Sequence, residues 1–301
     1  MDIDLEELNK LGPKFKNKIR CDAKKFLQSF YKNFIPQKIN FDFWLNHLNL
    51  LKNEFPLLEK FHLNQKGDFV NAYYFVSKLG EKARCNTTFV TDMGTALITA
   101  FQILEPSNGQ HLFTSQGLGE MGYGLPGAIG AWFANPNREI ICLNCDGGLM
   151  MNLQDLQTVI HNKIPMKIII FNNDGYLMIK HTQDAIVGGR RSGTDKESGL
   201  TCPNYENIAK AFGFKYISIK DDSDTEKKID ILLKNNNAII LEVFMKTNQP
   251  LVPKLSVSIS KTSQLLSPPL EDLKPFISLE KLKRYLLVDM HPNSIEIDRK
   301  N

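Results

Sequence analysis

An aspartate and an asparagine 27 positions apart are the residues of this chain best suited to hold a metal ion. Asp146 stands in the run Asn144-Cys145-Asp146-Gly147-Gly148, and Asn173 in the run Phe171-Asn172-Asn173-Asp174-Gly175. A small hard cation such as Mg²⁺ takes oxygen ligands and usually shares its shell with phosphates and water. Asp146 offers a charged oxygen and Asn173 a neutral one, so the pair predicts a site for a metal ion and a diphosphate.

The elements between these residues are one amphipathic helix pattern and one apolar strand pattern. A chain that leaves a parallel sheet and returns by such a crossover brings both residues to the same edge. Gly147 and Gly148 would leave backbone N–H groups open to a phosphate at the start of a helix expected from about residue 152 to 162. An Asp-Gly-Gly segment alone is usually a simple turn. The Asn-Asn segment after a second strand favours the site.

These segments resemble the thiamine diphosphate (ThDP) enzymes, and within them the acetolactate synthase large subunit and its decarboxylase relatives. The resemblance implies that Asp146, the Asn173 side chain and the Gly175 backbone carbonyl bind Mg²⁺, and that ThDP is the cofactor. Cys145 replaces the first glycine of the family's Gly-Asp-Gly motif and leaves the ligands intact. Gly147 and Gly148 belong to the implied cofactor site, which continues through Tyr176, Leu177 and Met178.

Two further segments support the resemblance. Residues 117–130 resemble the stretch around the aminopyrimidine ring, with Met121 as the bulky side chain under the bent cofactor and Gly119 offering its carbonyl to the 4′-amino group. Residues 91–96 resemble the loop that contacts the diphosphate from the other side, through Gly94, Thr95 and Ala96. An ordinary core methionine and close helix packing by the glycines are the plain structural alternatives.

Apolar strand patterns alternate with helix patterns from about residue 68 to 247. Buried strands are predicted at 89–90, 140–143, 167–171, 216–219 and 238–244, and helices at 68–82, 95–104, 125–133, 152–162, 205–212 and 224–234. This alternation predicts a doubly wound α/β fold, a mostly parallel sheet with helices on both faces and a ligand at the carboxyl ends of the strands.

The domain boundaries rest partly on the resemblance. Residues 1–66 resemble a remnant of the family's central domain and a linker, residues 67–250 form the ThDP diphosphate-binding domain, and residues 251–301 are a C-terminal extension. The proline-rich extension is expected to drape over the domain and to fray from about residue 285. Residues 176–201 are too long for a plain connection. They read equally as a lid, with Lys180, Arg190 and Arg191 aimed at a substrate carboxylate, or as a solvated surface loop.

Composition argues against several other classes. The 301 residues are 42% hydrophobic and 23% charged, with a net charge of +4 from 37 basic and 33 acidic side chains, which does not indicate nucleic-acid binding. No apolar run reaches the length of a membrane span and the N-terminus is acidic, so a cytoplasmic location is expected. The five cysteines are scattered. Cys142 and Cys145 should point to opposite faces of a strand, against a zinc or redox pair.

The resemblance also implies that this chain lacks one of the domains of a complete enzyme. A complete enzyme of the family has an N-terminal pyrimidine-binding domain that carries an essential glutamate, and this chain begins inside the central domain. No catalytic residue is therefore assigned here, and Glu120 is not given that role. We expect a chain that is inactive alone and needs either a partner carrying the pyrimidine-binding domain or a homo-oligomer. It would be a subunit of a split enzyme or the product of a truncated reading frame.

The expected substrate is pyruvate or a related small 2-oxoacid. Its decarboxylation would be followed by transfer of the two-carbon unit. Thr182 stands where acetolactate synthases carry a tryptophan that shapes the pocket for the second 2-oxoacid, and FAD, bound by the central domain in those enzymes, has no complete site here. A split 2-oxoacid decarboxylase and a non-catalytic ThDP-binding module are the alternatives.

Overall fold

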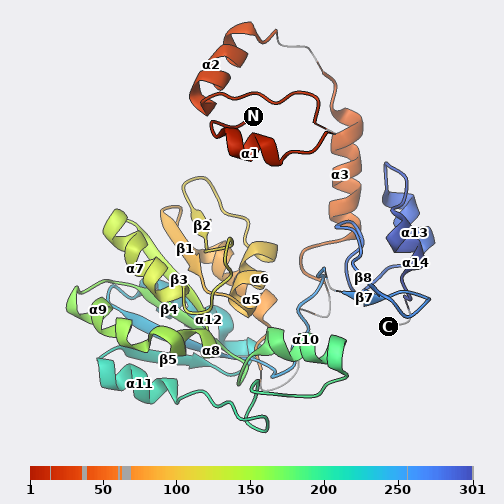
Figure 1. The fold of residues 1–301 in the computed structure, drawn as a ribbon. Coiled ribbons are helices and arrows are strands. Elements are labelled where there is room, and N and C mark those ends of the chain that lie inside the picture. Colours follow the sequence, from red (N-terminus) through yellow and green to blue (C-terminus); the bar gives the residue numbers. More distant parts are fainter. Residues whose placement is uncertain (14, 36–38, 60–61, 63–68, 256, 300–301) are drawn as a thin grey trace. The chain divides into compact units, whose positions relative to one another are not determined.

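The protein folds as two compact units, Met1–Asn53 and Glu54–Asn301. A computed structural model describes the chain except for residues 14, 36–38, 60–61, 63–68, 256 and 300–301 (Figure 1). The first unit holds α1 (Leu5–Lys10), α2 (Ala23–Asn33) and most of α3 (Asp42–Glu54). Asp4 and Asp22 cap the first two helices, because their carboxylates accept backbone N–H groups that have no partner within the helix. The functional residues predicted above all lie in the second unit.

Six parallel strands form the sheet of the second unit. They are β1 (Thr87–Thr91), β2 (His111–Phe113), β3 (Glu139–Cys145), β4 (Lys167–Asn172), β5 (Lys215–Ile219) and β6 (Ile239–Phe244). Their order across the sheet is β2-β1-β3-β4-β6-β5, and every neighbouring pair is parallel. The doubly wound α/β fold is therefore confirmed. The short edge strand β2 was not predicted, because its three residues are exposed or half-buried and carry no apolar run.

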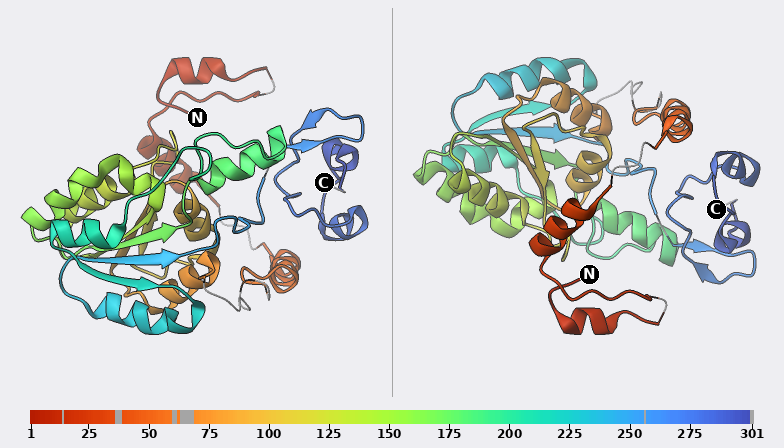
Figure 2. Two further views of the ribbon diagram at one scale, coloured as in Figure 1. Left: turned by 90° about the horizontal axis from the view of Figure 1, so that it is seen from below. Right: turned by 90° about the horizontal axis from the view of Figure 1, so that it is seen from above.

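Helices cover both faces of this sheet (Figure 2). α5 (Ala72–Lys82), α6 (Thr95–Ile103) and α12 (Thr225–Lys234) pack on one face, and α7 (Gly124–Ala134), α9 (Leu156–His161) and α11 (Tyr205–Phe212) on the other. Ile141 and Leu143 point into the first layer and Ile140 and Cys142 into the second, because successive side chains of a strand alternate. Cys145 joins the first layer, so the two cysteines do face opposite sides.

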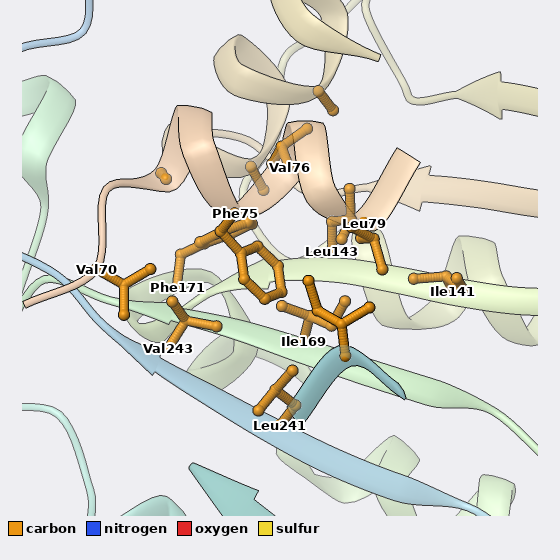
Figure 3. Packing of buried hydrophobic residues seen from close by; sticks show 14 of the residues in the cluster. Val70, Phe75, Val76, Leu79, Ile141, Leu143, Ile169, Phe171, Leu241 and Val243 are labelled. Atoms are coloured by element: carbon orange, nitrogen blue, oxygen red, sulfur yellow. The ribbon is translucent and has the colours of Figure 1, made fainter. Parts of the chain in front are cut away.

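Aromatic and branched side chains fill the first layer (Figure 3). Phe75 of α5 meets Phe171 of β4 edge-on, with ring centroids 5.7 Å apart and planes at 86°, a geometry favoured by the ring quadrupoles. Val70 lies beside this pair, and its backbone N–H donates to the carbonyl of Phe244 at 2.8 Å. This packing joins α5 and the residues before it to β4 and β6.

Two helices differ from the sequence-based expectation. The helix expected from residue 152 begins at Asp146: α8 (Asp146–Leu149) leads into the 3₁₀ helix η1 (Met150–Asp155), with a kink at Asn152, and then into α9. A second short 3₁₀ helix, η2 (Asp222–Asp224), precedes α12. In the segment predicted as a long loop, the first half is the helix α10 (Leu177–Val187), which ends at Gly188 in the left-handed conformation typical of helix ends.

The C-terminal extension carries the hairpin strands β7 (Ser258–Ile259) and β8 (Leu265–Leu266), followed by α13 (Leu279–Tyr285) and α14 (Pro292–Glu296). The chain was expected to fray from about residue 285, and this expectation is wrong for the residues up to Arg299. The guanidinium of Arg299 donates to both carboxylate oxygens of the buried Asp272, at 3.1 and 2.6 Å, and to the carbonyls of Ile277 and Ser294. Within the described part of the chain, no helix has the length and apolar character needed to cross a membrane.

Candidate functional site

A pocket lies where β1, β3 and β4 end. Its wall is made by Met93, Gly94 and Thr95 after β1, Gly119 and Met121 from the loop before α7, Cys145 at the end of β3 with Gly147 and Gly148 after it, and Asn173 with residues 175–179 after β4. Of the site residues predicted from the sequence, the pocket brings together Gly94, Thr95, Gly119, Met121, Gly147, Gly148, Asn173, Gly175, Tyr176, Leu177 and Met178. Asp146 and Ala96 are buried in the layer beneath.

Asp146 joins the ends of β3 and β4. Its Oδ2 accepts the backbone N–H groups of Asn173, at 3.1 Å, and Gly175, at 3.0 Å, and its Oδ1 accepts the N–H of Gly147 at 2.8 Å. The hydroxyl of Tyr205 donates to the Asp146 carbonyl. Burial raises the pKa of Asp146 to about 6, while the three N–H donors and the charge of Lys180 oppose this shift. The carboxylate therefore fixes the distance between the two segments that were expected to hold the metal.

Asn173 carries the clearest mark of a ligand site. The residue is 2% exposed, and its side-chain Oδ1 is buried without a hydrogen-bond partner among the described residues, while Nδ2 makes only a long contact, 3.4 Å, with Thr95 Oγ1. A buried amide oxygen without a partner is costly, and a cation would satisfy it. Among the described residues, no cluster of three or more His, Cys, Asp or Glu side chains is suited to a metal. One carboxylate with neutral oxygens, as here, suits Mg²⁺ shared with a phosphate.

Gly147 and Gly148, which line the pocket, have no space for a side chain. A Cβ atom at Gly147 would lie 2.1 Å from the ring of Tyr176, and one at Gly148 would lie 1.7 Å from Oδ2 of Asp92. Any side chain would therefore displace a neighbour. Gly175 has φ +132°, and a Cβ there would lie 2.2 Å from the Thr194 carbonyl oxygen. These three positions therefore need glycine, because the backbone there packs directly against neighbouring protein atoms.

Cys145, whose role the sequence left open, links the walls of the pocket. Its Sγ donates to the carbonyl of Met93 at 3.2 Å and accepts the N–H of Ala96 at 3.4 Å. Burial raises the pKa of this thiol, and the charge of Asp92 adds to the effect. A protonated thiol here acts as a hydrogen-bonding link between the end of β3 and the start of α6.

Asp92 is a residue of the site region that the sequence did not single out. It is fully buried, and its Oδ1 accepts the N–H groups of Gly122, at 2.7 Å, and Gly124, at 3.4 Å. Oδ2 has no hydrogen-bond partner among the described residues. Burial raises the pKa of Asp92 to about 6. The sequence signal was an aspartate directly after a buried strand, two positions before Gly94, but nothing in it indicated contact with the loop before α7.

The three basic residues of the 176–201 segment that were considered as partners of a substrate carboxylate differ in exposure. Lys180 is 5% exposed, and Arg190 is exposed. Arg191 pairs with Asp184 at 2.9 Å and donates to the Lys180 carbonyl at 2.6 Å. None of the three lines the pocket. Thr182 is exposed and its hydroxyl donates to the Met178 carbonyl at 3.1 Å.

Comparison with known proteins shows the family to which the chain belongs. Residues 92–243 match the family described as "Thiamine pyrophosphate enzyme, C-terminal TPP binding domain". The acetolactate synthase isozyme 2 large subunit of Escherichia coli K12 is 30% identical over 259 residues, which cover 84% of this chain and 44% of that protein. The acetolactate synthase large subunit of the red alga Porphyra purpurea is 29% identical over 233 residues, 77% of this chain and 38% of that protein. The chain thus spans less than half the length of the curated relatives it matches.

Proposed function

Because this chain belongs to the thiamine pyrophosphate enzymes and carries their C-terminal TPP-binding domain, we propose that its pocket binds ThDP through Mg²⁺. We propose further that it is the diphosphate-binding part of an acetolactate synthase-like enzyme, which decarboxylates pyruvate or a related 2-oxoacid and transfers the two-carbon unit. A cytoplasmic location is part of the same proposal.

The observation that carries the metal assignment is the buried, unsatisfied Oδ1 of Asn173, a residue whose backbone N–H donates to the carboxylate of Asp146. In the proposal, these two oxygens and the carbonyl of Gly175 hold Mg²⁺. Gly94, Thr95, Gly147 and Gly148 leave room for the diphosphate. When bound, ThDP supplies the carbon nucleophile that adds to the 2-oxoacid and accepts the electrons released with CO₂.

Residues of this chain would orient the cofactor rather than move its protons. Among the described residues, no Asp, Glu or His side chain lines the pocket. Glu120 is exposed and lies outside the lining. Met121, 37% exposed, contributes an apolar surface suited to the cofactor ring. The acid–base group would come from a partner chain with a pyrimidine-binding domain, or from another copy in a homo-oligomer that contains such a domain.

A split 2-oxoacid decarboxylase is the second candidate. It is favoured by Thr182, which is a small, exposed residue bonded to its own helix and outside the pocket lining. Release of an aldehyde would distinguish it from the synthase, which would release a 2-hydroxy-2-methyl-3-oxoacid. A non-catalytic ThDP-binding module is the third candidate, and binding without turnover alongside every partner chain would favour it.

The first test is ThDP binding to the full chain by isothermal titration calorimetry, with and without Mg²⁺. We expect saturable binding that depends on Mg²⁺ and is lost in Asp146→Ala. Because Asp146 accepts three backbone N–H groups, this variant should also lose stability, so its folding must be checked by circular dichroism. Asp155→Ala, in the neighbouring helix η1, is the matched control. Metal-independent binding would contradict the site.

The second test adds a chain that carries a pyrimidine-binding domain and follows pyruvate consumption. We expect no turnover with either chain alone and turnover with both. Product analysis then separates carboligation from simple decarboxylation. Turnover by the isolated chain would contradict the need for a partner.

A further inference from the structure

A second pocket opens beside α10, one helical turn beyond the residues that line the ThDP pocket. It lies between this helix and the segment that follows β6. Ala185, Leu251 and Val252 give it apolar walls, and the side chains of His181 and Lys254 meet inside it. Its chemistry differs from that of the ThDP pocket because its lining combines apolar walls with a lysine, a histidine and an aspartate.

Lys254 sits opposite another lysine. The backbone N–H of Lys254 donates to the carbonyl of Lys274, and the N–H of Lys274 donates to the carbonyl of Lys254, both at 2.9 Å, in an antiparallel bridge. Residues that exchange both hydrogen bonds project their side chains to the same side. Like charges directly opposite each other are destabilising. Burial, and then the charge of Lys274, lower the pKa of Lys254.

His181 adds to this concentration of basic groups. Its Nδ1 lies 3.2 Å from the Nζ of Lys254. Burial, and then Lys254, lower the pKa of His181 to about 4, so the imidazole is neutral near pH 7 and accepts a hydrogen bond from the ammonium. The charges of Lys180 and Arg191 act on His181 in the same direction.

The described residues supply little negative charge to balance this group. Asp184 also lines the pocket, and its charge opposes the lowering of the pKa of Lys254 and of His181. Its two oxygens, however, contact Arg191 at 2.9 and 3.1 Å. No carboxylate of the described residues forms an ion pair with Lys254 or Lys274; Lys274 lies instead over the ring of Phe276, 5.6 Å from its centroid. A half-buried ammonium without a counter-ion costs free energy that an anion would recover.

We propose that this pocket binds the carboxylate group of a small organic acid, with Lys254 as the direct partner of the carboxylate, Lys274 as a supporting charge and the apolar walls holding the organic part. The site is separate from the ThDP pocket and needs neither cofactor nor metal. Its failure would therefore leave the proposed function untouched. A 2-oxoacid and a simple carboxylic acid share this chemistry, and the experiment separates them.

The test uses nuclear magnetic resonance of the His181 ring in the full chain, without ThDP or Mg²⁺, at pH 7.5 and at an ionic strength held constant with NaCl. His181→Gln assigns the signal. Sodium 2-oxobutanoate, sodium butanoate and sodium phosphate are titrated separately. We expect a saturable shift with the organic acids. A shift with 2-oxobutanoate alone makes the ligand a 2-oxoacid, and equal shifts with both make it a carboxylate in general.

Lys254→Met should weaken the binding at least tenfold, because it removes the charge while keeping most of the unbranched side chain. Lys246→Met removes a charge from an exposed position before the pocket and should leave binding unchanged. Lys274→Met leaves the His181–Lys254 contact in place and should weaken binding by a smaller factor, which keeps the test valid if Lys254→Met does not fold. The proposal is wrong if no organic acid saturates the signal, if phosphate binds equally well, or if Lys254→Met binds like the wild type.

Discussion

The carboxylate of Asp92 lies against the backbone of Gly148, so closely that a Cβ atom at Gly148 would be 1.7 Å from Oδ2. Through this contact the end of β1 supports the helix α8. The other oxygen of Asp92 accepts the N–H groups of Gly122 and Gly124. One buried side chain thus connects the segment expected to bind the diphosphate with the loop expected to bind the pyrimidine.

Gly148→Ala should lower the free energy of unfolding by about 1–3 kcal/mol, because the added methyl group overpacks a buried site. It should also weaken ThDP binding. Gly130→Ala is the matched control, since Gly130 lies in α7 with nothing within 4 Å of an added Cβ. There the substitution should raise stability by about 0.5–1 kcal/mol. Urea denaturation measures both, and equal effects at the two positions would contradict the tight contact at Gly148.

Asn173→Ala should remove the dependence of ThDP binding on Mg²⁺ at little cost in stability. The side chain makes only one long hydrogen bond within the protein, 3.4 Å to Thr95, and its Oδ1 makes none among the described residues. Calorimetric titration of ThDP with and without Mg²⁺ measures the dependence. The neighbouring Asn172→Ala is a useful comparison, because Asn172 Nδ2 donates to Glu242 at 2.5 Å and does not line the pocket. Retained Mg²⁺ dependence in Asn173→Ala would exclude its oxygen as a ligand.

Lys167→Met should destabilise the fold by up to about 3–5 kcal/mol. The buried carboxylate of Glu139 would keep only the hydroxyl of Thr87, at 2.8 Å, and a long contact with Arg84, at 3.9 Å. Lys167 Nζ lies 3.1 Å from Glu139 Oε1, and both side chains are at most 5% exposed. The exposed pair Lys210–Glu206 is the control, and Lys210→Met should cost less than about 1 kcal/mol. Because Glu139 and Lys167 begin β3 and β4, at the opposite end from the pocket, ThDP affinity at a temperature where the variant is folded should not change. A change in affinity there would show that the two ends of the sheet are coupled.

Asp92→Asn should change how stability depends on pH. Burial raises the pKa of Asp92 to about 6, from an ordinary value of 3.8, so the folded state binds a proton more tightly than the unfolded state. The contribution of Asp92 to the free energy of unfolding is therefore fully present below pH 3.8 and is lost as the pH rises through 6. This free energy changes with pH by at most about 1.4 kcal/mol per pH unit.

The pH dependence is measured as the difference between wild type and variant. The titration of His181 affects stability in the opposite direction. Its pKa is lowered to about 4, so its contribution to the free energy of unfolding is present above pH 6.5 and is lost as the pH falls toward 4. Subtracting the Asp92→Asn curve removes this background. If the difference between the curves is flat from pH 4 to 7, the pKa of Asp92 is not raised.

The sequence predicted the sheet and most of the pocket, because both depend on local patterns. The short, isoleucine-rich run 167–171 favoured a buried strand, and the helix between two successive strands favoured their lying side by side, with the polar segments after them at one edge. Two features depended on contacts instead. α8 begins at Asp146 although Gly147 and Gly148 are poor helix formers, because their lack of side chains is needed beside Tyr176 and Asp92. α10 begins at Leu177, and its N-cap Tyr176 makes no side-chain cap hydrogen bond, so the sequence carried no signal for the start of this helix.

The order of the strands sets the order in which the pocket can be assembled during folding. Thr88 of β1 pairs with Ile140 of β3, and Ile141 of β3 with Lys167 of β4, so the walls of the pocket come from parts of the chain that meet only after long loops have closed. Such non-local pairing is slow. The segment after β1 is made before β3, and its contacts with Cys145 and Gly148 form only when β3 is complete. A ligand of this pocket would therefore bind after the central strands have paired, and it would stabilise the finished sheet rather than guide its formation.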